Sequence, residues 1–181
     1  MLVRSIAVGL AAAALFSTAA QAADLIIPTT PQPIYEAAGF SWEGLYAGVQ
    51  GGGQFYPNLS YGLLGAHVGV NFIPSDPILL GLEVTGEAIF DGGSTFGEFF
   101  VNGRLGAVVS DQVLLYVLAG TGVEVAGGGG GTFGTYQLGG GAEFAVTDSI
   151  SLRGQLVGVG FYGDPDFFDG AKATVGISYH F

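Results

Sequence analysis

The sequence alternates between apolar and polar residues with a period of two over eight stretches that together cover Trp42–Phe181. In the last stretch, AKATVGISYHF, Val175 and Tyr179 fall on one face, and Lys172 and Ser178 fall on the other. A period of two is the side-chain period of a β-strand, because successive side chains point to opposite faces. The eight predicted strands lie near residues 42–53, 60–73, 78–90, 96–110, 112–126, 132–147, 149–162 and 171–181. The alternation therefore predicts an all-β chain.

The lengths of the strands and of their connections point to a membrane. Each stretch has at least ten residues, and crossing an apolar band of ~25 Å at a tilt of ~40° takes about ten residues. Three connections are tight and place Ser or Thr before Asp, at 73–77, 110–111 and 147–148. The other four, YPNL, DGGST, AGGGGGT and GDPDFFDG, are expected to be longer. Short turns on one side and longer loops on the other are typical of outer-membrane barrels, and an even strand number puts both termini on the periplasmic side.

The alternation alone does not say which face points outward. The stretch 78–90 has Leu80 and Leu82 on one face and Glu83 and Glu87 on the other. A soluble barrel would bury the aliphatic face, but here the polar face is rich in glycine, and charged residues make up only 10% of the chain, against about 25% in soluble domains. We therefore predict an eight-stranded antiparallel up-and-down transmembrane β-barrel, with its aliphatic face toward lipid. Aromatic residues near the strand ends fit interfacial girdles: Trp42, Phe72, Phe90, Phe99, Phe144, Tyr162, Tyr179 and Phe181.

Charged residues in the polar phase are expected to fill the lumen. An unpaired buried charge costs several kcal/mol, so such groups must pair, and the interior of an eight-stranded barrel is just wide enough for side chains to fill it. We predict a plugging network and a structural or surface role. The first alternative is a narrow porin-like diffusion channel for small solutes, and the weaker one is a soluble periplasmic ligand-binding barrel. The predicted network comprises Glu83, Glu87, Arg104, Glu124, Glu143, Arg153 and Lys172.

The N-terminal region has the layout of an export signal. One basic residue, Arg4, precedes an apolar stretch and then small residues up to Ala22. The apolar stretch is shorter than the ~20 residues of a transmembrane helix. We expect a signal peptide at 1–22, an extended proline-bearing periplasmic tail at 23–41 and the barrel at 42–181 in a Gram-negative cell envelope.

Composition excludes several classes of function. After the expected signal only three basic residues remain, against fifteen acidic residues in the chain, so a nucleic-acid partner is not expected. The chain contains no cysteine, which excludes a thiolate metal site or a thiol nucleophile. We expect no cofactor.

No motif indicates an enzyme. His67 and His180 are the only histidines, no nucleophile motif accompanies them, and hydrogen bonding within a packed lumen explains both. The glycine pattern at 158–163 is followed by no helix, so it does not predict a dinucleotide site. Asp164 and Asp166, with Asp169, offer oxygen ligands for Ca²⁺, or for Mg²⁺ shared with lipopolysaccharide, but a solvated acidic loop is the preferred explanation. No metal site is predicted.

Both ends of the barrel region resemble a known family. The start AADL, a proline-bearing tail and FSWEGLYAGVQGG, together with the final TVGISYHF, resemble the small outer-membrane β-barrel proteins of alphaproteobacteria, the porin-family or opacity-like proteins with an OmpA-like barrel. The resemblance implies an outer-membrane location in contact with lipid and lipopolysaccharide. It also implies that Tyr179 and the terminal Phe181 form the signal read by the barrel-assembly machinery. It specifies no oligomeric state and no ligand.

This resemblance yields a prediction on assembly. Deleting Phe181 is expected to impair outer-membrane insertion more than deleting three residues of 127–131, because only the terminal aromatic residue belongs to the assembly signal. The measurement is the fraction of each variant recovered in outer-membrane preparations. Equal recovery of the two deletions would contradict the assignment.

Overall fold

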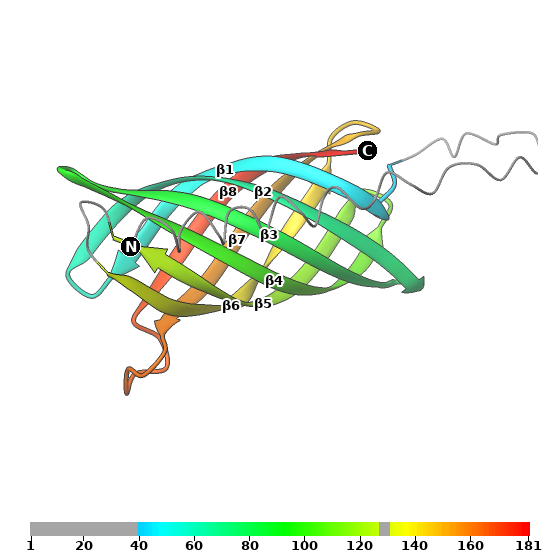
Figure 1. The fold of residues 1–181 in the computed structure, drawn as a ribbon. Coiled ribbons are helices and arrows are strands. Elements are labelled where there is room, and N and C mark those ends of the chain that lie inside the picture. The colour runs from blue at the N-terminus through cyan, green and yellow to red at the C-terminus, as the bar shows by residue number, and fades with distance from the viewer. Residues whose placement is uncertain (1–39, 127–130) are drawn as a thin grey trace, which may run out of the picture. The chain divides into compact units, whose positions relative to one another are not determined.

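A single closed barrel forms the described part of the chain. The computed structural model describes residues 40–126 and 131–181, and the expected signal peptide, residues 23–39 of the expected tail and residues 127–130 lie outside that part. Every strand pairs antiparallel with its neighbours in chain order, and β8 closes the barrel on β1 (Figure 1). The strands are β1 Gly44–Tyr56, β2 Leu59–Ser75, β3 Ile78–Asp91, β4 Ser94–Ser110, β5 Val113–Val125, β6 Thr132–Ala145, β7 Ile150–Phe161 and β8 Gly170–His180. The predicted fold class is confirmed.

The connections differ in part from the expected asymmetry. The turns β1–β2 and β3–β4, expected to be longer loops, contain only residues 57–58 and 92–93, because their strands extend further than the alternation indicated. Pro57 and Asn58 are typical turn residues, and Gly92 has a positive φ of 51° that favours glycine. Of the four connections expected to be longer, those between β5 and β6 and between β7 and β8 are longer, and the latter is orange in Figure 1. The β6–β7 connection, expected to be tight, contains residues 146–149.

The apolar face of the strands points outward and the polar face points into the barrel, as predicted. On β3, Leu82 is 59% exposed, whereas the adjacent Glu83 is 1% exposed. The same alternation continues around the barrel, so its outer surface is apolar and its interior combines polar groups with an apolar cluster that includes Leu79, Leu114 and Phe100. Among the described residues, none forms a helix of the length and hydropathy needed to cross a membrane.

The expected aromatic girdle has one exception. Seven of the eight aromatic residues assigned to it are exposed, and Trp42 is 3% exposed. Trp42 precedes β1 in the same two-residue phase as the inward-facing Tyr46, so its ring turns into the barrel. The assignment of Trp42 to an interfacial girdle was therefore wrong.

Candidate functional site

Four charged side chains form what we call the arginine cluster, namely Glu83, Arg104, Glu143 and Arg153. Arg153 donates from Nη1 to Glu83 Oε2 at 2.7 Å and from Nη2 to Glu83 Oε1 at 3.2 Å. Arg104 Nη2 donates to Glu143 Oε1 at 2.6 Å, and its Nη1 lies 3.5 Å from Glu83 Oε2. All four side chains are buried. Because two guanidinium groups face two carboxylates, the cluster is electrically balanced.

Tyrosines hold the arginine cluster in place. Tyr46 donates its hydroxyl proton to Glu83 Oε2 at 2.8 Å and accepts from Arg104 Nη1 at 2.5 Å. The Arg104 guanidinium also lies 4.0 Å from the ring centroid of Tyr116, within the range of a cation–π contact. Tyr116 in turn donates to Gln155 Oε1 at 3.0 Å, and this oxygen also accepts from Arg153 at 2.8 Å. The buried side chains of two tyrosines and a glutamine thus contact both guanidinium groups.

A second group, the lysine cluster, consists of Lys172, Glu87 and Glu98. Lys172 Nζ donates to Glu87 Oε2 at 2.5 Å and to Glu98 Oε2. The amide of Gln50 donates to Glu87 at 2.6 Å, and that of Gln54 donates to Glu98 at 3.1 Å. One ammonium therefore faces two carboxylates, and this cluster keeps an excess of negative charge.

Both clusters cross the lumen. Arg153 on β7 reaches Glu83 on β3, and Lys172 on β8 reaches Glu98 on β4. In a closed order of eight strands, β3 and β7 are four strands apart, as are β4 and β8. The two ion pairs therefore connect opposite walls of the barrel.

The predicted lumen residues are only partly brought together. Six of the seven take part in these ion pairs. The seventh, Glu124, is half-buried and lies across from Glu98 in the β4–β5 register, and no ion pair reaches it within the described residues. Glu98 is buried in the lysine cluster and was missed, although it shares the two-residue phase of Arg104. Following that phase from Arg104 through Asn102 and Phe100 would have reached it.

Comparison with solved structures identifies the kind of barrel. The N-terminal barrel domain of Pseudomonas aeruginosa OprF has a TM-score of 0.53 at 15% identity, with 75% of this chain and 97% of that chain covered. Ail, the attachment invasion locus protein of Yersinia pestis, has a TM-score of 0.53 at 13% sequence identity, with 77% of this chain and 99% of that chain covered. Neisserial surface protein A has a TM-score of 0.51 at 12% sequence identity, with 76% of this chain and 96% of that chain covered. The chain shares the eight-stranded fold of these outer-membrane β-barrels. No protein-family model and no curated protein matches the sequence.

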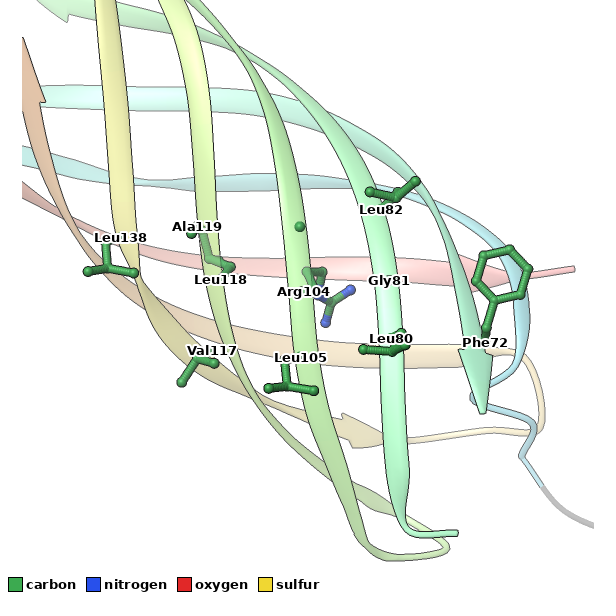
Figure 2. Close-up of a pocket in the computed structure, with 11 residues that line it drawn as sticks. Phe72, Leu80, Gly81, Leu82, Arg104, Leu105, Val117, Leu118, Ala119 and Leu138 are labelled. Carbon is green, nitrogen blue, oxygen red and sulfur yellow. The ribbon is translucent and has the colours of Figure 1, made fainter. Parts of the chain in front are cut away.

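The outward surface of the barrel contains shallow apolar hollows. One of about 520 Å³ lies over β2–β6. Figure 2 shows Leu80, Leu82 and Leu105 along it, with the nitrogens of Arg104 drawn in the gap between the ribbons of β3 and β4. The small residues Gly103 and Ala119 also line it. The hollow contributes no outward-facing polar group, so it offers only apolar contact of the kind that lipid tails make.

Aromatic residues close the end of the barrel that carries the C-terminus. Trp42 Nε1 donates to the backbone oxygen of Asp111 at 3.2 Å, and its own carbonyl accepts from Asn71 Nδ2 at 3.1 Å. The ring of Phe40 lies 4.5 Å from that of Trp42 and 4.6 Å from that of His180, between centroids. Sequence reasoning placed Phe40 in a tail without a core of its own, and the structure instead packs it against the apolar cluster inside the barrel.

The two histidines are buried and do not form a hydrolytic triad. His67 Nε2 lies 2.9 Å from Ser178 Oγ, and His180 Nε2 lies 3.1 Å from Ser151 Oγ. Ser151 donates to Glu143 at 3.4 Å, so the serine stands between the histidine and the acid. A triad requires the histidine between serine and acid, and the Nδ1 atoms of both histidines have no hydrogen-bond partner within the described residues.

The described residues give no metal centre built from side chains. Among them, no group of three or more His, Cys, Asp or Glu side chains is placed to hold a metal ion. In the β7–β8 loop, Asp164 Oδ1 accepts from the amide of Asp166 at 3.3 Å, and Asp169 Oδ2 accepts from the amide of Phe161 at 2.9 Å. Two of the three loop carboxylates therefore accept hydrogen bonds from backbone amides.

Proposed function

We propose that this outer-membrane barrel has a closed lumen and serves the envelope through its body and surface. The observation that supports closure is the pair of ion-pair clusters that connect opposite walls. Guanidinium and ammonium groups held by buried carboxylates cannot leave without exposing uncompensated charge. The aromatic contacts of Phe40 and Trp42 add a second obstruction at the periplasmic end.

A narrow diffusion channel is the second candidate. It is favoured by buried lumen atoms that have no hydrogen-bond partner in the protein, among them Gln50 Oε1, Thr135 Oγ1 and Thr174 Oγ1. Buried polar groups of this kind are usually satisfied by ordered water. A continuous row of water molecules past both clusters would conduct small ions.

Single-channel conductance distinguishes the two candidates. We expect refolded wild-type protein in planar bilayers to be silent and the double variant Arg104→Ser/Arg153→Ser to conduct, because the variant removes the side chains that fill the lumen between β3, β4 and β7. The matched control is Arg104→Lys/Arg153→Lys, which keeps both positive charges and most of the volume and should conduct less than the serine variant. A steady, discrete wild-type conductance would overturn closure and favour the channel.

A further inference from the structure

The β7–β8 loop, residues 162–169, carries exposed aromatic side chains at the barrel end opposite the C-terminus. Tyr162 is 61% exposed and Phe167 is 66% exposed. With Phe168 and with Tyr136 of β6 they form what we call the aromatic patch. Its ring centroids lie 5.3 Å apart for Tyr136–Tyr162, 5.9 Å for Tyr136–Phe167 and 4.6 Å for Phe167–Phe168. A contiguous exposed patch of this kind marks a surface that contacts a partner other than water.

Two glycines of β7 show on which side of the wall the aromatic patch lies. Gly158 and Gly160 are in the outward phase of β7, together with the exposed Leu156, and the residues of the other phase are buried. A Cβ on Gly158 would therefore point outward, and it would lie 2.7 Å from the ring of Phe168. A Cβ on Gly160 would lie 2.8 Å from the backbone oxygen of Phe167. The loop thus covers the outside of the wall and not the lumen face of β7.

Hydrogen bonds hold the loop on this outer face. The Tyr136 hydroxyl donates to the backbone oxygen of Phe167. The ring of Tyr162 lies over the outward-facing Gly134 of β6, where an added Cβ would be 3.1 Å from it, and its hydroxyl donates to Thr121 Oγ1 of β5 at 3.0 Å. The loop therefore lies over the outer side of β5–β7, and Figure 1 shows it, in orange, extending to the side of the barrel.

We propose that the aromatic patch anchors this loop in the adjoining lipid leaflet, at the boundary between headgroups and acyl chains. The patch is continuous with the wall that faces lipid, because Gly158 pairs in register with Leu138, and both Leu138 and Leu156 are exposed. The same loop exposes Asp164 and Asp166, and a segment with an apolar side and a wet side suits the membrane interface. The inference rests on the proposed membrane location of the barrel and is independent of lumen closure.

Tryptophan fluorescence in vesicles of brominated phosphatidylcholine tests the anchor. Trp42 is the only tryptophan of the chain, so each variant is made on a Trp42→Phe background, and the full chain is refolded into the vesicles. We expect Phe167→Trp to lose more fluorescence in lipid brominated close to the headgroup than in lipid brominated near the end of the acyl chain. The matched control is Tyr61→Trp, at the same barrel end but in the inward phase of Leu63, which should keep its fluorescence in both lipids.

A third variant, Leu82→Trp on the outward face of β3, separates failure of the anchor from failure of the membrane location. Quenching of Leu82→Trp without quenching of Phe167→Trp would overturn the anchor alone, whereas an unquenched Leu82→Trp would overturn the membrane location. Equal quenching of Phe167→Trp and Tyr61→Trp would also overturn the anchor, because lipid would then reach this end without regard to side. Protection of Phe167→Trp from aqueous acrylamide that rises with protein density, without quenching by lipid, would assign the patch to a second copy instead.

Discussion

Replacing Glu83 with alanine is expected to destabilise the barrel by about 3–5 kcal/mol, since removing one partner of a buried ion pair leaves the other charge uncompensated. Here the loss falls at the upper end of that range, because Glu83 accepts from Arg153 twice, lies 3.5 Å from Arg104 and accepts from Tyr46. One substitution would therefore leave one guanidinium without its carboxylate and the other with Glu143 alone. Urea unfolding of the refolded protein in phospholipid vesicles measures the change.

The control for this prediction is Glu43→Ala, which removes an exposed carboxylate just before β1. A change within about 0.5 kcal/mol is expected there, as for surface substitutions in general. A further comparison replaces Glu83, Arg104, Glu143 and Arg153 together by apolar residues of similar volume, which should recover much of the lost stability because no charge remains buried. If Glu83→Ala cost no more than Glu43→Ala, the arginine cluster would not be held together by its charges.

Much of the fold could be predicted because a barrel strand repeats a simple local rule. Alternation placed Leu82 outward and Glu83 inward, and the structure agrees. The same phase identified six of the charged residues that pair, without any knowledge of which partner each would meet. A local period reports the face of a strand and nothing more.

Features that depend on distant contacts were not predictable in the same way. The pairing of Arg153 with Glu83 joins residues 70 positions apart, and it depends on the stagger of the strands around the barrel, which no single stretch encodes. Trp42 looked like an interfacial residue because aromatic residues are common there; its burial follows from contacts with Asp111 and Asn71 on other strands and turns. The turns after β1 and β3 were misjudged because glycine and asparagine also allow a two-residue turn.

Replacing Gly139 with alanine is expected to destabilise the barrel by about 1–3 kcal/mol, the usual cost of inserting atoms into a well-packed interior. Gly139 faces the lumen on β6, and a Cβ there would lie 2.8 Å from Val157 Cγ1 and would overlap the backbone of Leu156 and Val157 on β7. A backbone cannot turn aside as the end of a flexible side chain does, so the strands would have to separate. The measurement is again urea unfolding in vesicles, with the β6–β7 register followed by amide exchange.

Gly154→Ala provides the matched control, because Gly154 lies on the adjacent strand β7 and a Cβ there meets nothing within 4 Å. With no close neighbour, the added methyl should only reduce the freedom of the unfolded chain and stabilise by about 0.4–1 kcal/mol. The two substitutions therefore have opposite expected signs, although both change glycine to alanine within a strand. If both stabilised the barrel, the close approach of β6 and β7 would not be the reason for glycine at position 139. If both substitutions destabilised the barrel equally, the cause would be a general requirement of these strands for glycine. The contact between position 139 and β7 would then not be the reason.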